Sequence, residues 1–407
     1  MAAQISKNVI QVTRKHNILV ASFATQRCEY STEPYTYKHP TTAKLRQGTG
    51  GRSSFNGIVC TVFGNTGYIG HKLVSHLGRV GTQLILPYRG DEYETIRMRV
   101  CGDLGQLWFN HFDLKDEESI VKSIRHSNVV VNLIGKEFET SNFSFNDVHV
   151  EGARRLARLS KECGVERFIH VTPLSASPHP PPLILKEGSK FLKSKWDGEQ
   201  AVKEEFPNAT IVRLADAYGL GDKFVSRYVS IYRYLSGAIP LWEMGEKTLK
   251  RPVCVEDACR GLVEVVSNPR TAGKTYQFVG PKQYKLGDII DWINTMRYTK
   301  PSLRSLRYRR TDIKKDYLFN LKISFLEAIA PRYPIEFASW EAIEQEQHSD
   351  HFDSSLPTLE DLGITPADME KQMPWAVKPY KYEGKSELIL THFDPVPEIK
   401  SVPSLCN

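Results

Sequence analysis

Residues Ile58–Gly70, which read IVCTVFGNTGYIG, hold the clearest fold signal in this chain. Residues 58–63 form a run rich in β-branched and aromatic side chains, apolar except for a single threonine. Such a run is typical of a strand that is buried on both faces. Beyond it, Ile69, Leu73 and Leu77 recur with the spacing of one helical face. The stretch therefore predicts a strand that passes through a glycine-rich turn into a helix.

A glycine-rich turn between a strand and a helix is where a dinucleotide pyrophosphate binds. Glycines allow the tight turn and the close approach of the backbone, and the N–H groups and dipole of the new helix hold the negative charge. The spacing here differs from G-x-G-x-x-G, and a turn without a ligand is the alternative. A further strand at 84–88 favours the nucleotide, and no Lys-Ser/Thr pair closes the loop as in a Walker-type ATP site. The predicted cofactor-binding residues of this turn are Gly64, Asn65, Thr66, Gly67, Tyr68, Ile69 and Gly70.

The composition is that of an ordinary globular protein. The chain has 407 residues, of which 41% are hydrophobic and 25% are charged, enough for two or three domains or for one large α/β domain with additions. No run approaches the roughly 18 consecutive apolar residues of a transmembrane helix. More than half of the net charge of +7 comes from residues 1–28, so the rest of the chain gives little reason to expect a nucleic-acid partner.

The first 30 residues have the composition of a mitochondrial presequence. Basic and weakly amphipathic, they carry no acidic residue before position 29. A basic tail without a targeting role is the alternative. Residues 31–54 are predicted to be an extended lead-in.

The seven cysteines are scattered, odd in number and without a CxxC pair, so we expect no disulfide framework and no metal site.

Strands and helices alternate regularly over residues 55–280. This alternation predicts an α/β fold, a Rossmann-like doubly wound parallel sheet with helices on both faces, whose ligand lies at the carboxyl ends of the strands. The expected strands are 58–63, 83–88, 107–112, 128–134, 167–172, 210–214 and 275–279. The expected helices begin near Gly70, Asp91, Asp116, Asn146, Lys190, Asp222 and Val255.

The remaining chain is predicted to form a smaller α-rich extension over 281–352 and an extended C-terminal arm over 353–407. Within the extension, 304–315 holds six basic residues and one acidic residue, and 317–330 is an apolar helix candidate. One reading is a solvated basic face beside an ordinary packed helix. The other is a surface that docks against lipid headgroups or a large partner.

The residue after the second strand favours NADP(H) over NAD(H). An acidic residue about 20 residues beyond the glycines would bind the ribose hydroxyls of NAD, whereas an arginine favours the 2′-phosphate of NADP. Arg89 holds that position, although Asp91 and Glu92 follow closely. Asp113 and Leu114, at the end of the third strand, are expected on the adenine side. Leu133, Ile134 and Gly135 are expected on the pyrophosphate side.

Four segments carry a resemblance to a known superfamily. They are FGNTGYIG at 63–70, FDL at 112–114, NLIG at 132–135 and VHVEGARRLARLSKECGVERFIHVT at 148–172. Together they resemble the extended and atypical short-chain dehydrogenases/reductases over about residues 55–280. The resemblance implies a nucleotide-binding fold more firmly than it implies any activity.

In active members of that superfamily a Tyr-x-x-x-Lys motif carries the chemistry. Its Tyr exchanges a proton with the substrate while its Lys holds the nicotinamide ribose. Residues 191–195 (FLKSK) match this motif, with Lys195 in place and Phe191 where the Tyr should be. Thr172 or Ser175 would stand for the usual carbonyl-polarising hydroxyl. A phenyl ring has no proton to give, so we predict no catalytic residue and assign Thr172 and Lys195 to cofactor binding.

Residues 221–257 and the tail motif PTLEDLGI at 357–364 carry a closer resemblance. With the features above, they resemble a family of NADPH-binding accessory subunits of mitochondrial respiratory complex I. The resemblance implies a tightly held NADPH outside the electron path, a place on the matrix side of the inner membrane, and other complex I subunits as partners. The basic stretch beside the apolar helix candidate adds inner-membrane lipid headgroups as a further expected partner. The alternatives are an active NADP-dependent short-chain reductase or epimerase on a small carbonyl or sugar-nucleotide substrate, and a sensor of the NADPH/NADP⁺ ratio.

Overall fold

The structure is a computed structural model of the whole chain. The predicted presequence and most of the lead-in lie outside the residues that it describes. Those residues are 47–48, 50–229, 238–297, 308–329, 339–380 and 398–403.

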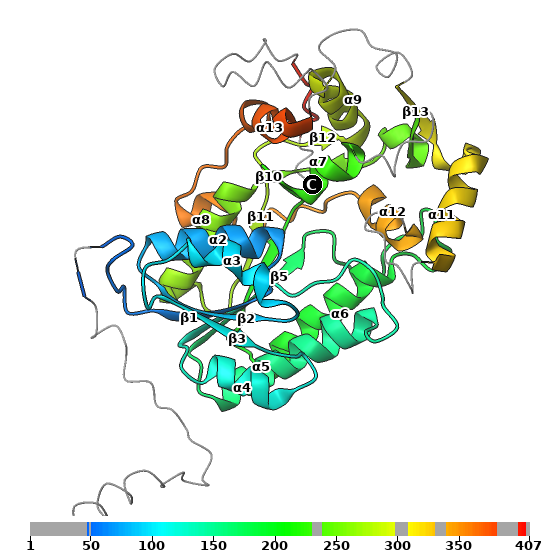
Figure 1. Cartoon of the computed structure of the whole chain (residues 1–407). Coiled ribbons are helices and arrows are strands. Elements are labelled where there is room, and N and C mark those ends of the chain that lie inside the picture. The colour runs from blue at the N-terminus through cyan, green and yellow to red at the C-terminus, as the bar shows by residue number, and fades with distance from the viewer. Residues whose placement is uncertain are drawn as a thin grey trace, which may run out of the picture. The chain divides into compact units, whose positions relative to one another are not determined.

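A seven-stranded parallel sheet forms the centre of the fold (Figure 1). Its strand order, β11-β6-β5-β4-β1-β2-β3, reverses direction between β4 and β1, which makes the carboxyl ends of these two strands the topological switch point. The predicted doubly wound fold is therefore confirmed. The strands are β1 (Val59–Phe63), β2 (Gln83–Tyr88), β3 (Leu107–His111), β4 (Val129–Asn132), β5 (Arg167–Pro173), β6 (Thr210–Leu214) and β11 (Thr275–Phe278).

Both faces of the sheet are buried under helices. Along β4, Val129 and Val131 belong to one apolar core, whereas Val130 belongs to the other. This alternation explains why the central strands are apolar throughout. The first face is covered by α2 (Tyr68–Arg79), η2 (Glu92–Thr95), α3 (Ile96–Arg99) and α8 (Val255–Ser267), and the second by α4 (Glu117–Ile124), η3 (Asp147–Glu151), α5 (Gly152–Glu162) and α6 (Lys190–Glu205).

A smaller layer lies beyond the carboxyl ends of the strands. Its apolar core joins α7 (Lys223–Val229), α9 (Leu286–Arg297) and α13 (Met369–Val377). Three two-stranded sheets support it, pairing β7 (Ala217–Tyr218) with β10 (Val253–Cys254), β9 (Leu249–Lys250) with β12 (Tyr284–Lys285), and β8 (Ala238–Leu241) with β13 (Arg309–Asp312). The short turns η4 (Trp242–Gly245) and η8 (Lys378–Tyr380) also belong to this layer. Of the others, η5 (Pro269–Thr271) and η7 (Glu360–Leu362) contact α8, and η6 (Ile313–Lys315) contacts α11 (Tyr317–Ile329).

Besides α9, two further helices lie in the described part of the predicted α-rich extension, 281–352. They are α11 (Tyr317–Ile329) and α12 (Trp340–Gln347), and they share a small apolar core. None of the helices that the structure describes is long and apolar enough to span a membrane.

The prediction of an extended arm from residue 353 differs from the structure over residues 353–380. The N–H of Gln277 on the edge strand β11 donates to Pro357 O (2.9 Å), and Leu359 is buried against the main core. Met369, Met373 and Val377 of α13 then pack into the second core. This part of the tail belongs to the folded domain because its spaced apolar side chains find a partner there.

Four cysteines, Cys60, Cys101, Cys254 and Cys259, have free thiols that are buried. Burial raises the pKa of the Cys60 thiol to about 12. Across the described ranges, no group of His, Cys, Asp and Glu side chains is placed to hold a metal ion.

Candidate functional site

The glycine-rich turn has the backbone geometry that its sequence predicts. Gly64 has a φ of +82°, and a Cβ atom there would lie 2.9 Å from the carbonyl carbon of Leu133 at the end of β4. A Cβ atom on Gly70 would lie 2.2 Å from the carbonyl oxygen of Gly64. Gly67 begins α2 without a capping side chain, so the first N–H groups of that helix are left for a ligand.

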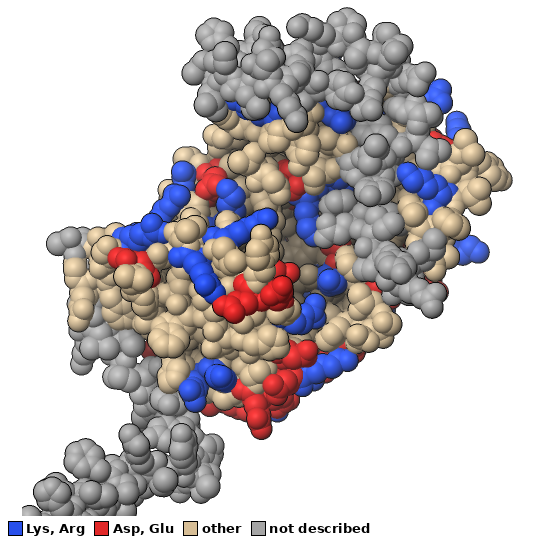
Figure 2. Space-filling view, viewed as in Figure 1, with Lys and Arg blue, Asp and Glu red and all other residues tan. Residues whose placement is uncertain are grey.

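A cavity of about 280 Å³ lies directly above this turn at the switch point of the sheet. An adjoining groove of about 990 Å³ shares Gly67, Tyr68, Gly135 and Glu137 with it. Together they follow the turn and the loop after β4, as a dinucleotide cleft requires. On the face shown in Figure 2, basic and acidic side chains are interspersed around a hollow.

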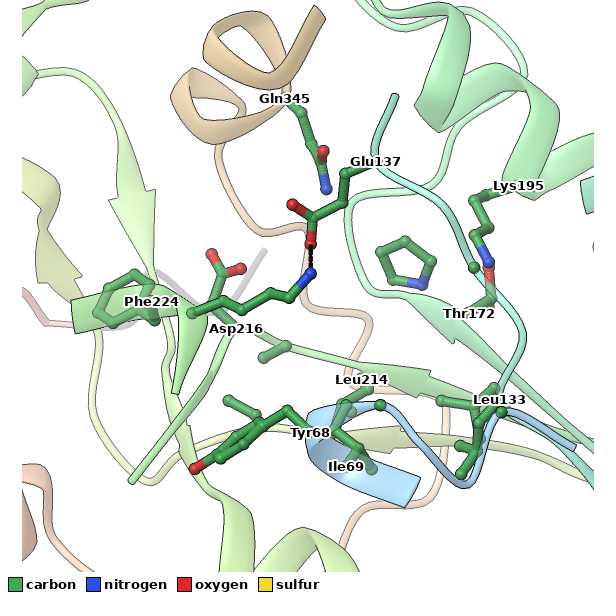
Figure 3. A pocket seen from close by; sticks show the side chains of 18 of the residues that line it. Tyr68, Ile69, Leu133, Glu137, Thr172, Lys195, Leu214, Asp216, Phe224 and Gln345 are labelled. Atoms are coloured by element: carbon green, nitrogen blue, oxygen red, sulfur yellow. Dashed lines mark hydrogen bonds and ion pairs between the residues drawn. The ribbon is translucent and has the colours of Figure 1, made fainter. Parts of the chain in front are cut away.

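The cavity brings together most of the predicted cofactor-binding residues. Thr66 lines the adjoining groove. The predicted residues that line the cavity itself are Gly64, Gly67, Tyr68, Ile69, Gly70, Leu133, Gly135, Thr172 and Lys195 (Figure 3).

Five predicted residues lie outside the two cavities. Asn65 is buried and donates to Val62 O (3.0 Å) and Pro87 O (2.6 Å), which ties the ends of β1 and β2 together. Arg89 is exposed, with its guanidinium 5.3 Å from the centre of the Phe143 ring. The others are Asp113, whose carboxylate accepts from Lys115 N (2.8 Å), Leu114, which is buried under α4 and α5, and Ile134, which packs against the same core.

Lys195 and Phe191 share the face of α6 that lines the cavity. The Lys195 ammonium is buried and donates to Ile134 O (3.0 Å). Burial lowers the pKa of Lys195 to about 8. The Phe191 ring is 4% exposed and meets the rings of Phe145 and His149 edge-on. Nearby, the Thr172 hydroxyl is buried without a hydrogen-bond partner among the described residues.

Comparison with known proteins identifies the family. Residues 60–280, more than half of the chain, match the model of the NAD dependent epimerase/dehydratase family. A rat protein named NADH dehydrogenase (ubiquinone) 1 alpha subcomplex subunit 9, mitochondrial, is 42% identical over 329 residues, covering 81% of this chain and 82% of its own. The chain belongs to the subunit 9 family, within the epimerase/dehydratase family.

A fungal relative and a bacterial structure extend the comparison. The 40 kDa subunit of mitochondrial NADH-ubiquinone oxidoreductase from Neurospora crassa is 36% identical, and the match covers 79% of each chain. The dTDP-glucose 4,6-dehydratase DesIV of Streptomyces venezuelae, solved with NAD and TYD bound, superimposes with a TM-score of 0.57 at 17% identity, covering 79% of this chain and 97% of that one. The second likeness supports the fold alone.

In this member of the subunit 9 family, the histidine nearest to Phe191 is held neutral. His149 accepts from Lys136 N at Nε2 (3.1 Å), so its Nδ1 donates to the Ser194 hydroxyl (2.8 Å). Burial, together with the charge of Lys195, lowers the pKa of His149 to about 2. The ring therefore cannot replace the missing tyrosine as an acid at neutral pH.

The far wall of the cavity consists of residues that sequence reasoning missed. Glu137 forms ion pairs with Lys223 (3.4 Å; Figure 3) and Arg227 (3.5 Å), and Asp216 pairs with Lys250 (2.8 Å). These charges compensate one another although they come from α7, β9 and two separate loops, so no local pattern in the sequence could have revealed them. The other missed residues of this wall are Phe224 and Gln345.

Proposed function

We propose that this chain is a non-catalytic accessory subunit of mitochondrial complex I that binds NADPH structurally. The observation that carries the proposal is Phe191, which stands in the cleft beside Lys195 at the position of the family's proton donor. General acid catalysis commonly contributes a factor of about 10²–10⁴, and its loss removes the main basis for turnover. The names of the rat and fungal relatives support the assignment to the complex and to mitochondria.

The described residues fit a dinucleotide. The turn around Gly64 and Gly70 leaves no room for side chains, which suits a pyrophosphate at the start of α2. Lys195 and the unpartnered hydroxyl of Thr172 supply polar groups for the nicotinamide ribose side. Arg89, exposed directly after β2 and outside the two cavities, is the cation that we assign to a 2′-phosphate. When bound, NADPH could act as a hydride donor, but Phe191, which holds the position of the family's proton donor, has no proton to give.

A bound nucleotide stabilises the fold to which it binds. The gain is RT ln(1 + [L]/Kd), about 4 kcal/mol when the free ligand is a thousandfold above Kd. The cleft joins the ends of β1, β4 and β5 to the second layer, so a ligand there links the two cores of the subunit. We therefore assign NADPH a role in stability and assembly, near the junction of the matrix and membrane arms.

The first test is the identity of the nucleotide that survives gentle purification. Mass spectrometry of a denatured extract is expected to find near-stoichiometric NADPH in the wild type. Arg89→Ala should lose most of it, because the 2′-phosphate would lose its cation. Arg125→Ala, which changes an exposed arginine at the end of α4 away from both cavities, should retain it.

Two results would contradict the proposal. NAD(H) in the extract would show that Arg89 does not select the 2′-phosphate. Oxidation of the bound NADPH by small carbonyl or sugar-nucleotide compounds at a useful rate would favour the active reductase or epimerase instead.

We further propose that α11 docks the subunit on other parts of the complex and on inner-membrane lipid headgroups at the matrix side. Tyr317, Leu318, Leu321 and Phe325 are 64–86% exposed and lie along one side of the helix. The exposed Lys314 and Lys315 come just before its N-terminus, where the helix dipole disfavours positive charge. The two lysines are unfavourable at this helix end, but an anionic lipid surface would bind them while the apolar side chains of α11 contact the membrane.

Vesicle binding tests this surface. The full chain should bind vesicles that contain cardiolipin, and Lys314→Glu with Lys315→Glu should weaken binding roughly 30-fold, at about 1 kcal/mol for each basic residue lost. The matched control reverses two exposed lysines on α4 and α5, outside α11 and the segment before it, Lys122→Glu with Lys161→Glu. Equal binding by both double variants would contradict a lipid-docking role for α11.

A further inference from the structure

The acidic residues of α12 face the protein interior. Glu344 is fully buried and Glu346 is 2% exposed, although α12 is only eight residues long. Buried carboxylates are costly unless hydrogen bonds or ion pairs compensate them, so their partners define what this helix is attached to.

Glu344 and Glu341 fasten α12 to the two segments that frame the Phe191 side of the cavity. The Glu344 carboxylate accepts the backbone N–H groups of three consecutive residues, 183–185, at 2.7–3.1 Å. Burial works against its charge, but the nearby His348 ring and the hydrogen bonds from these N–H groups hold the pKa of Glu344 below its usual value. Glu341 accepts from the Ser189 hydroxyl (2.5 Å) and from Phe191 N (2.8 Å), at the start of α6.

Glu346 connects α12 to the cavity wall. Its carboxylate pairs with Arg227 Nε (3.1 Å), and Arg227 also pairs with Glu137, which lines both the cavity and the groove. Gln345, the residue between these carboxylates, lines the cavity itself (Figure 3). Its side-chain oxygen is buried and accepts no hydrogen bond within the described part of the chain, which leaves it available to a donor on a ligand.

The chain that follows α12 is fastened on the opposite side of the cavity. Thr248 donates to Gln347 O (3.0 Å), and Asp350 accepts from Arg251 N (2.8 Å). Lys250 pairs with both Asp350 (3.7 Å) and Asp216 of the cavity wall (2.8 Å). Residues 339–350 therefore cross from the α6 side of the cleft to the β9 side.

This crossing segment also supports α11. Ile343 of α12 is buried together with Phe319 and Ile323 of α11, and the Trp340 indole donates to the Ser324 hydroxyl (3.3 Å). The two helices lie side by side in Figure 1. The helix α12 thus packs against α11 on one side and lines the nucleotide cleft with its other side.

We propose that residues 339–350 form a latch over the bound nucleotide, in which Gln345 contacts the nucleotide and the three glutamates position it. The inference rests on the proposed nucleotide site and adds its regulation. A ligand that holds the latch shut also holds α11 in place, and docking of α11 must reciprocally tighten nucleotide binding. The position of α11, and with it the docking surface, therefore depends on whether the nucleotide is bound.

The test is the dissociation rate of NADPH from the loaded full-length chain. Glu344→Gln keeps the shape of the side chain but removes its charge, and the rate is expected to rise about tenfold, the value of one charge-assisted hydrogen bond. Gln345→Ala should raise the rate about fivefold. This variant leaves the glutamates intact, so it still tests the proposal if Glu344→Gln does not fold. Glu360→Gln, an exposed glutamate on η7, should leave it unchanged.

Hydrogen exchange supplies the second readout. Removing NADPH from the wild type should increase exchange in α11 and α12, and in Gln345→Ala this dependence should shrink. Unchanged dissociation from Gln345→Ala, or equal exchange in α11 with and without NADPH, would overturn the latch while leaving the proposed function standing. A wild type that purifies without nucleotide and binds no added NADPH would overturn both.

Discussion

Gly70→Ala is expected to abolish nucleotide retention and to lower the free energy of unfolding by about 3 kcal/mol. The new methyl group would lie 2.2 Å from Gly64 O and 2.7 Å from the Cα of Asn65. Both contacts are with backbone atoms, which cannot rotate away, so the turn must open; overpacking of this kind costs about 1–3 kcal/mol and occasionally more. Denaturant unfolding measures the stability, and mass spectrometry of the extract measures the nucleotide.

Gly67→Ala is the matched control for this experiment. Gly67 has an ordinary φ of −71°, and its Cβ would meet only Gly64 O, at 3.3 Å. The fold should therefore lose less than about 1 kcal/mol, whereas the methyl group would enter the cleft and weaken nucleotide binding. If Gly70→Ala matched the wild type in stability and in bound NADPH, the turn would not be the pyrophosphate site.

The sequence predicts the central sheet well because its signals are local. Each of the seven expected strands is present, and no strand end differs from its expected position by more than two residues. The runs are short, apolar and bounded by turns. Strands that are buried on both faces, as at Val129–Val131, read as continuous apolar stretches, which are easy to recognise in the sequence. The placement of Phe191 beside Lys195 on α6 also followed from a motif five residues long.

The second layer was not predicted, because its pairings join segments far apart in the sequence. Arg309–Asp312 reads as part of a basic stretch, yet it forms β13 by pairing with Ala238–Leu241. The helix α13 contains Pro374 and lies in a proline-rich tail, so composition pointed to an extended arm. Its Met369, Met373 and Val377 side chains are buried only because α7 and α9 pack against them, and the sequence does not indicate these contacts.

The same limit applies to the site. The glycine turn and Lys195 carry recognisable motifs, whereas Glu137, Asp216 and Arg227 gain their meaning from ion pairs between different elements. Gln345 has no sequence signal at all, since it reaches the cavity only because α12 folds back over α6. Nucleotide binding could be inferred locally, but closure of the cleft could not.

The second large effect is expected at Glu199, whose replacement by glutamine should cost about 3 kcal/mol at neutral pH. Glu199 is fully buried on α6, where it accepts from Arg213 Nε (3.1 Å), Arg213 Nη2 (2.9 Å) and Lys203 Nζ (2.8 Å). Breaking a fully buried pair typically costs about 3–5 kcal/mol, and the low end of that range applies here because the Arg213 and Lys203 side chains are 18% and 38% exposed. Glu204→Gln on the same helix, 69% exposed at its side chain, should change stability by less than about 0.5 kcal/mol.

The pH dependence separates loss of the charge from loss of packing. Burial opposes the charge of Glu199, but the hydrogen bonds from Arg213 and Lys203 prevail and hold its pKa below the ordinary 4.5. A depressed pKa contributes stability that is fully present above the unfolded-state value and is lost as the pH falls through the folded-state value. The stability difference between wild type and Glu199→Gln should therefore be constant from pH 7 to about 5 and shrink below that. A difference that persists unchanged at low pH would assign the effect to packing of α6 rather than to the buried ion pairs.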